Sequence, residues 1–524
     1  MADASPLAPD STTHHDARIA VRNSIQLGLS LIATYGVGVA IRLFFLPRAL
    51  GKEALGIFAA ADAAANTAFL FTTFGMEPYA QKEVSIRIDH ASDFTGGVMV
   101  IRAVMFVVLS TLLQVVLWAN GQSLTMRLTA LGMGGMWALY QQNSAFNGLL
   151  TAGREVKGLA KINVTNKLLW GAAVVAFVVP GGGVVGAAMA FFLAEGIKAV
   201  LVYREAFRHL PLKLKVDWSG TFGALKKAFP FMLNSISLIY SRLDVNMMSW
   251  WHMSEAELGW YGAAVQIAGF TLILTPLLGG AILPLFSRAA ARSREELNAV
   301  GARTMSTILT FALAGAFAMA LASELMVRLT AGKDFLPAVP ALMILCANFA
   351  CTYVAVVSSY FMWAKGRPWT MTGISAFGLL INPIFNLVFI RPLAVRGAGW
   401  AGVGAAIATV STELFIILIL LFFTGRGLFD RKVLSMLART AVVIALVGAL
   451  HVELKPLVES PPFWLGAAHG IPVLAVRLLI EAAAYVGLAI LTRAINVRET
   501  LEFARGALKS RQERRAVVEE PKAA

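Results

Sequence analysis

The chain has few charged residues for its length. Asp, Glu, Lys and Arg make up 14% of its 524 residues, whereas 58% are hydrophobic and the mean hydropathy is +0.70. A soluble domain carries about 25% charged residues, so a water-soluble fold is excluded and the lipid bilayer must be the solvent for most of the chain. The apolar runs are continuous and do not alternate with a period of two, which excludes a β-barrel. We therefore predict an all-α polytopic membrane protein.

Cysteine and histidine are too scarce, or wrongly placed, for most catalytic sites. Cys346 and Cys351 share one expected span, so they cannot join two loops, and we expect both to be reduced packing residues. The seven histidines lie in tails, loops or ends of spans. The longest external loop, from His451 to Gly470, is too short to form a catalytic domain. We therefore expect no enzyme activity, no metal and no cofactor.

Basic residues outnumber acidic ones, 45 to 30, but they concentrate in alternate loops. One such loop carries Arg204, Arg208, Lys213, Lys215, Lys226 and Lys227, whereas the loops on the opposite side hold few basic residues. By the positive-inside rule, this pattern places the basic loops and both termini in the cytoplasm and requires an even number of spans. We predict a bacterial inner-membrane protein that contacts membrane lipids and has no nucleic-acid partner.

Hydropathy predicts about fourteen spans. They fall near 22–46, 54–78, 96–118, 124–150, 159–180, 183–203, 229–251, 257–286, 302–328, 338–363, 369–390, 398–424, 433–452 and 471–492. We expect a disordered tail over 1–17, an N-lobe of helices 1–6 over 18–210 and a C-lobe of helices 7–12 over 211–430. Helices 13–14 are expected over 431–495, followed by a basic cytoplasmic tail over 496–524.

The division into two lobes is predicted from an internal repeat. Two short patterns recur in the same order about 200 residues further along the chain. They are Leu55-Gly56 with Phe58, which recurs as Leu258-Gly259 with Tyr261, and Val185–Ala188 with Glu195, which recurs as Val403–Ala406 with Glu413. A repeat unit of six helices enters the membrane twice in the same direction, so the two lobes should enclose a central cleft.

Ionisable and amide side chains inside spans are the candidate substrate-binding residues, because polar groups in the membrane are costly. The set is Arg42, Asp62, Arg102, Gln141, Asn143, Asn147, Asn163, Lys167, Arg242 and Asp244. Cations bind phosphate oxygens and amides pair with hydroxyls, so Arg102, Lys167 and the nearby amides predict a site for a sugar diphosphate. The alternative is structural, with amides and salt bridges holding helices together.

Three pairs of charged residues need separate interpretation. Arg242 and Asp244 are two apart on a helix, so they cannot pair with each other, and each needs water or a partner such as a charge of the other lobe. Glu195 and Glu413 occupy matching repeat positions and are either scaffold residues or a coupling site for H⁺ or Na⁺. Arg477 and Glu481 are four apart and can pair with each other.

Several short motifs resemble one transporter family. They are Leu46-Pro47-Arg48-Ala49-Leu50-Gly51, Leu243-Asp244, Leu258-Gly259-Trp260-Tyr261, Ile282–Arg288, Gly332–Leu336 and Gly402–Ala406. With these motifs the chain resembles the Wzx-type oligosaccharide flippases, of the polysaccharide-transporter family in the multidrug/oligosaccharidyl-lipid/polysaccharide superfamily. The resemblance implies two six-helix lobes with two extra helices. It also implies transfer of an undecaprenyl-diphosphate-linked repeat unit to the periplasmic leaflet by alternating access, for O-antigen, capsule or exopolysaccharide synthesis.

The resemblance also suggests protein partners, namely a polysaccharide polymerase and chain-length proteins. Two alternatives from the same superfamily stay open: a multidrug/cation antiporter, which predicts an acid-lined cleft, and a lipid II flippase, whose arginine-rich stretches we do not find here. A membrane enzyme of glycan assembly is the alternative from another class, and it lacks the histidine and the large external loop that such chemistry uses.

Overall fold

The computed structural model describes residues 34–85, 87–153, 155–213, 215–236, 240–270, 275–454 and 471–494. Within them every regular element is a helix and no strand occurs, which confirms the all-α membrane fold. Nine helical stretches of this described part are long and apolar enough to cross a membrane. Each expected span overlaps a described helix, but the number fourteen stays a prediction. The expected tails over 1–17 and 496–524, and most of the loop from His451 to Gly470, lie outside the described residues.

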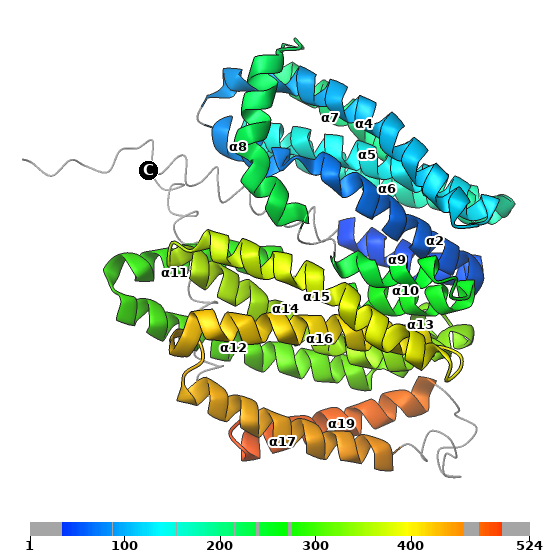
Figure 1. Cartoon of the computed structure of the whole chain (residues 1–524). Helices are drawn as coiled ribbons and strands as arrows, with labels where there is room; N and C mark the ends of the chain where they lie inside the picture. The colour runs from blue at the N-terminus through cyan, green and yellow to red at the C-terminus, as the bar shows by residue number, and fades with distance from the viewer. Residues whose placement is uncertain are drawn as a thin grey trace, which may run out of the picture.

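The N-lobe contains the helices drawn from blue to cyan in Figure 1. After a π-helical turn at Ala40–Phe45 come α2 (Leu46–Leu70), the short α3 (Met76–Glu83), α4 (Ala91–Ala119), α5 (Leu124–Ala152), α6 (Val156–Phe177) and α7 (Gly183–His209). The first span turns into the second at Gly51, whose φ of 75° interrupts α2. A side chain at this left-handed φ would be strained, so glycine permits a turn that needs no loop.

The C-lobe contains α9 (Tyr240–Trp250), α10 (Glu255–Gly269), α11 (Thr275–Arg292), α12 (Arg294–Leu321), α13 (Ser323–Thr330), α14 (Val339–Ala364), α15 (Pro368–Ala394) and α16 (Trp400–Thr424). Pairs of neighbours repeat between the lobes, because α5 packs on α7 as α14 packs on α16, and α6 packs on α7 as α15 packs on α16. This repetition agrees with the predicted duplication. The helices α17 (Arg431–Glu453) and α19 (Ile471–Leu491) pack together beside the C-lobe (Figure 1).

Polar residues placed just before helices explain where several of them begin. The Ser254 hydroxyl accepts a hydrogen bond from the Glu257 backbone N–H at 3.2 Å, so it satisfies one of the free donors in the first turn of α10. Ser123 does the same for Met126 in α5, and Asp430 does so for Val433 in α17. Each of these N-cap residues directly precedes a helix that the apolar runs predict, so capping and composition indicate the same helix starts.

The two lobes meet at one end of the molecule, where α2 crosses α10. A Cβ at Gly56 would lie 1.8 Å from the Glu255 carbonyl oxygen, and one at Gly259 would lie 1.9 Å from that of Lys52, so only glycine fits at either position. These are the glycines of the repeated Leu-Gly pattern. We call this the outer end, because loop charge predicts that it faces the periplasm. A single cluster of buried hydrophobic residues spans both lobes here, whereas separate clusters fill each lobe towards the opposite end.

Helix α8 (Trp218–Ile236) follows the connector between the lobes and packs on α3 and α4 of the N-lobe. Our sequence boundaries assigned it to the C-lobe. Gly96 and Gly97 of α4 allow this contact, because a Cβ at either would lie within 2.3 Å of the Lys215 carbonyl oxygen or the Thr221 hydroxyl. Of the expected span at 229–251, the structure describes α8 up to Ile236 and α9 from Tyr240.

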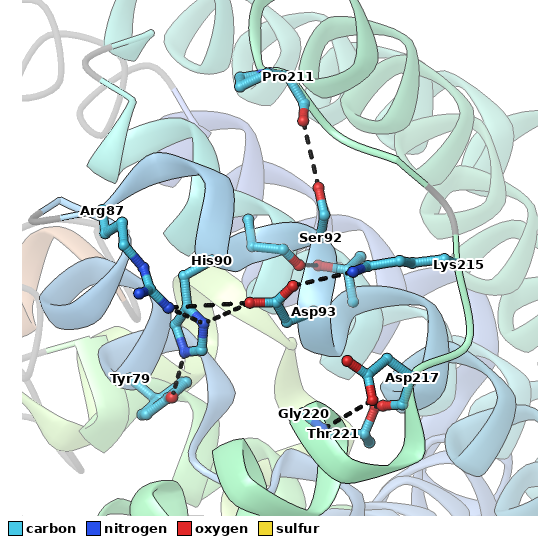
Figure 2. Close-up of polar contacts among 12 residues, drawn as sticks. Tyr79, Arg87, His90, Ser92, Asp93, Pro211, Lys215, Asp217, Gly220 and Thr221 are labelled. Atoms are coloured by element: carbon cyan, nitrogen blue, oxygen red, sulfur yellow. Dashed lines mark hydrogen bonds and ion pairs between the residues drawn. The ribbon is translucent and has the colours of Figure 1, made fainter.

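Polar contacts fix the connector to the start of α4 (Figure 2). The Lys215 ammonium lies 3.2 Å from an Asp93 carboxylate oxygen, and the Lys213 backbone N–H donates to the Ser92 hydroxyl at 3.0 Å. His90 lies between the Asp93 carboxylate and the Tyr79 hydroxyl, at 3.0 Å from each. The connector, α8 and the N-lobe are therefore joined by both packing and hydrogen bonds.

Candidate functional site

A cavity of about 790 Å³ lies between the two lobes. The N-lobe contributes its wall from the first span, α2, α5, α6 and α7, and the C-lobe contributes from α9, α10, α14 and α16. It brings together nine of the twelve residues singled out in the sequence, namely Arg42, Asp62, Asn147, Asn163, Lys167, Glu195, Arg242, Asp244 and Glu413. A volume in this range accommodates a drug-sized ligand.

Two cations of the N-lobe wall rest on aromatic rings. The Arg42 guanidinium carbon lies 5.1 Å from the centre of the Phe191 ring, and the Lys167 ammonium lies 3.8 Å from that of Trp170. The two rings meet edge to face at 5.0 Å, so they form one platform. Among the described residues, no carboxylate lies within ion-pair distance of either cation. Cation–π contacts compensate only part of the lost hydration, so both charges remain available to an anion.

The carboxylates of the cavity, in contrast, have partners. Asp62 accepts from the Trp137 indole N–H at 2.8 Å and lies 3.8 Å from the Arg242 guanidinium of the other lobe. Glu195 accepts from the Asn143 amide at 2.8 Å. The structure thus gives Arg242 a partner in the other lobe, which is one of the alternatives that the sequence left open.

Asp244 is held within the C-lobe and is almost completely buried. Its carboxylate accepts hydrogen bonds from the Val245 backbone N–H at 2.8 Å, the Thr409 hydroxyl at 3.3 Å and the Tyr261 hydroxyl. Three donors satisfy a charge that burial would otherwise make costly. Asp244 and Arg242 therefore have different partners, as their spacing on α9 predicts.

The cavity carries no excess of cationic residues. Its wall includes the carboxylates of Asp62, Glu77, Glu195, Asp244 and Glu413 and the cations of Arg42, Lys167, Lys198 and Arg242. What distinguishes Arg42 and Lys167 among these cations is therefore the aromatic ring against each, combined with the absence of a carboxylate within ion-pair distance in the described part of the chain.

Arg102, Gln141 and Asn143 do not line the cavity. Arg102 donates to the Thr72 carbonyl at 2.9 Å, the Thr73 carbonyl at 2.8 Å and the Gln142 side-chain oxygen at 3.0 Å. Two of its three acceptors are carbonyls of the 3₁₀ turn, Phe71–Thr73, that follows α2. The structure thus places Arg102 outside the cavity, where it holds the turn between α2 and α3, and its expected role as a phosphate ligand stays a prediction.

Two residues of the cavity wall, and two aromatic residues that contact its cations, were missed in the sequence. The aromatic platform of Trp170 and Phe191 has no sequence signal, because aromatic residues are common in apolar spans. Gln266 of α10 and Asn348 of α14 had a usable signal, since each is an amide within an apolar run. Outside the cavity, Glu155, Glu205 and His209 bring possible metal-ligand atoms within 4.8 Å of one another at the ends of α6 and α7.

Comparisons with known proteins agree with this architecture. Residues 20–290 match the family described as "Polysaccharide biosynthesis protein", whereas no curated protein matches. The fold is similar to that of the lipid II flippase MurJ in an inward closed conformation, with a TM-score of 0.67 and 15% identity over 90% of this chain and 99% of that one.

Two multidrug transporters share the fold as well. An inward-facing MATE family transporter of the MOP superfamily matches with a TM-score of 0.60 and 14% identity, over 76% of this chain and 98% of that one. The MATE multidrug transporter DinF-BH matches with a TM-score of 0.55 and 19% identity, over 82% of this chain and all of that one. The chain is thus a multi-pass membrane protein with the fold shared by flippases and multidrug transporters.

Proposed function

Because the chain belongs to the polysaccharide biosynthesis protein family, we propose that it is a flippase. It moves undecaprenyl-diphosphate-linked oligosaccharide repeat units from the cytoplasmic to the periplasmic leaflet of the bacterial inner membrane by alternating access. The observation that carries this proposal is the pair of cations, Arg42 and Lys167, which line the cavity with no carboxylate within ion-pair distance among the described residues. A diphosphate supplies the anionic oxygens that such cations bind.

In this mechanism the cavity accepts the headgroup while the outer end is closed by the α2–α10 crossing. Phosphate oxygens bind to Arg42 and Lys167, and the prenyl tail stays in the bilayer. The lobes then separate at the outer end, and the Asp62–Arg242 pair, which bridges them, must rearrange. Glu195 and Glu413 are the candidates for coupling this cycle to H⁺ or Na⁺, and a polysaccharide polymerase and chain-length proteins are the partners expected to take the product.

Replacing Lys167 by Gln tests the proposal. Export of the lipid-linked glycan should be lost in a complementation assay, while the abundance of the protein in the membrane stays normal, because no partner acid is stranded. Lys167→Arg should retain part of the activity, since the charge persists although its geometry differs. Lys161→Gln, an exposed charge change on the same helix, is the matched control and should export normally. Normal export by Lys167→Gln would overturn the proposal.

The five carboxylates of the cavity favour one second candidate, a drug or cation antiporter. A cationic dye would then bind to the carboxylates, and Arg42 and Lys167 would repel it. Dye efflux from cells that express the protein separates the two functions, because the flippase predicts no efflux above that of cells lacking the protein.

A further inference from the structure

A second cavity, of about 310 Å³, lies between the C-lobe and the added helices α17 and α19. Most of the side chains that line it are apolar, and the polar ones are Glu324, His451 and Arg477. It lies at the outer end, because α13 on its wall meets the N-lobe there through a hydrogen bond from Arg48 to the Leu329 carbonyl at 2.6 Å. The described residues that line it include none that line the central cavity.

Arg477 of α19 is almost completely buried but leaves one nitrogen free. Its Nε donates to the Glu481 carboxylate at 2.9 Å, and its Nη2 donates to the His451 carbonyl at 2.6 Å. The third nitrogen, Nη1, has no hydrogen-bond partner among the described residues and is accessible. Because only 7% of Arg477 is exposed and the residue lines the cavity, we infer that this free edge of the guanidinium faces the cavity.

Glu324, in the first turn of α13, presents the opposite charge in the same way. Arg328 donates to one of its oxygens, Oε1, at 2.9 Å from Nε and at 2.8 Å from Nη2. The other oxygen, Oε2, has no partner within the part of the chain that the structure describes, and it is accessible as well. Glu324 and Arg477 are each balanced by a neighbouring charge. The cavity thus offers one donor edge and one acceptor oxygen, from two different helices.

The chemistry of these two groups selects a ligand that carries both charges. A phosphate oxygen binds the free guanidinium edge of Arg477, and a primary ammonium donates to the free oxygen of Glu324. An anion without an ammonium would leave the carboxylate unpaired, and a quaternary ammonium has no N–H to donate. Beside Arg477 on α19, the side chains of Val476, Leu479 and Ile480 are exposed and apolar, so acyl chains can lie against this face.

We propose that this cavity binds the headgroup of phosphatidylethanolamine, a phospholipid with a primary ammonium, from the leaflet at the outer end. Its phosphate contacts Arg477 Nη1, and its ammonium contacts Glu324 Oε2. Because Arg477 belongs to α19 and Glu324 to α13, the bound lipid joins the added helices to the C-lobe. The inference goes beyond the proposed function and does not depend on it.

Lipid binding to the purified full-length protein, stripped of lipid in detergent, tests this inference. Native mass spectrometry compares three probes with the same acyl chains, namely phosphatidylethanolamine, phosphatidylcholine and phosphatidylglycerol. The first should bind at least about tenfold more tightly than the other two, because hydrogen bonds to charged groups are the strong ones. It should also raise the melting temperature most, since a ligand of the folded state stabilises that state. Equal affinity for the three lipids would overturn the inference.

Glu324→Gln removes the charge that distinguishes the headgroups. Affinity for phosphatidylethanolamine should fall about tenfold, to that for phosphatidylcholine. The variant should fold normally, because Glu324 and Arg328 form a partly exposed pair and the glutamine oxygen still accepts. Glu255→Gln, which changes an exposed acid in the first turn of α10 at the same end, is the matched control and should keep the preference. A preference that survives in Glu324→Gln would refute the site.

Arg477→Lys tests the phosphate contact. Lysine keeps a cation beside Glu481, but one ammonium cannot replace a fork that makes three contacts, so all three lipids should bind more weakly. If this variant does not fold, Glu324→Gln still decides the question. Normal binding of the three lipids by folded Arg477→Lys would contradict the assignment of the phosphate.

Lys167→Gln separates the two cavities. It should weaken binding of a short polyprenyl diphosphate and leave binding of phosphatidylethanolamine unchanged. Loss of phosphatidylethanolamine binding in this variant would place the phospholipid in the central cavity and refute the inference. Normal binding of the polyprenyl diphosphate would instead count against the proposed function alone.

Discussion

Two cationic regions of the N-lobe look alike in the sequence and differ in the structure. Arg102 of α4 and Lys167 of α6 both lie within apolar spans and have no acid nearby along the chain. In the structure, Arg102 donates to two carbonyls of the turn after α2 and to the Gln142 side chain of α5, whereas Lys167 lines the cavity with its ammonium against the Trp170 ring. The partners of a buried cation, rather than its presence, indicate whether it is free to bind a ligand.

Breaking the Arg102 site should have the largest effect on stability. Arg102→Met strands the carbonyls of Thr72 and Thr73 and the oxygen of Gln142, and each unpaired buried acceptor costs about 1–3 kcal/mol. For three acceptors we expect a loss of at least about 3 kcal/mol in the free energy of unfolding and a fall in the amount of protein in the membrane. The loss of stability is measured by the melting temperature in detergent and by the abundance of the protein in the membrane. Lys167→Gln is the comparison variant, for which both quantities should stay unchanged. Normal abundance combined with lost export would instead move Arg102 into the substrate site.

The contact between α2 and α10 is of a different kind, because it is a close approach of two helix backbones that glycine permits. Gly56→Val and Gly259→Val each place a Cβ less than 2 Å from a backbone carbonyl oxygen, so the helices must separate. Overpacking typically costs about 1–3 kcal/mol, and here the cost falls on the state in which the outer end is closed. We therefore expect inserted protein with strongly reduced export. Gly448→Val of α17, where nothing lies within 4 Å of the added Cβ, is the matched control and should export normally.

Sequence reasoning predicted the all-helical membrane fold, which the structure confirms, and a repeat with which the packing of the helices agrees, because both depend on local or periodic patterns. Apolar runs predicted the spans, and the Leu-Gly pattern at Gly56 and Gly259 marked the positions where the lobes cross. Charges inside spans identified Arg42 and Lys167, because such charges are rare for a physical reason. Family membership, inferred from short motifs, is confirmed by the match over residues 20–290.

Other features could not be read from the sequence, because they depend on contacts distant along the chain. The role of Arg102 is set by carbonyls about thirty residues away, in the 3₁₀ turn that follows α2. Packing of α8 against the N-lobe follows from Gly96 and Gly97, whose meaning appears only when the connector is in place. The aromatic platform under Lys167 combines α6 and α7, and no spacing rule within one helix predicts it.

Removing the aromatic platform should affect ligand binding more than folding. Trp170→Leu keeps the packing apolar but removes the ring that lies 3.8 Å from the Lys167 ammonium. A desolvated cation–π contact contributes about 2 kcal/mol, so the ammonium should lose its fixed position and affinity for a short polyprenyl diphosphate should fall by up to about thirtyfold. Phe349→Leu, which removes a C-lobe aromatic ring of the same cavity that neither cation rests on, is the control. An equal loss with both variants would show that the effect comes from the cavity shape.

The pair formed by Asp62 and Arg242 should show the smallest effect, although it joins the two lobes. Its atoms are 3.8 Å apart and the Arg242 side chain is about one-third exposed, so solvent screens the attraction. Exposed ion pairs contribute about 0.2–1 kcal/mol, and Asp62 keeps its hydrogen bond from Trp137 when Arg242 is replaced. A double-mutant cycle of Asp62→Asn and Arg242→Gln, read from melting temperatures, should therefore give a coupling energy within that range. Because the pair forms across the lobes with the outer end closed, each single variant should also favour the separated arrangement. A coupling energy of zero within error would show that the two side chains meet without stabilising the closed outer end. The crossing of α2 and α10 at Gly56 and Gly259 would then be the contact that keeps the outer end closed.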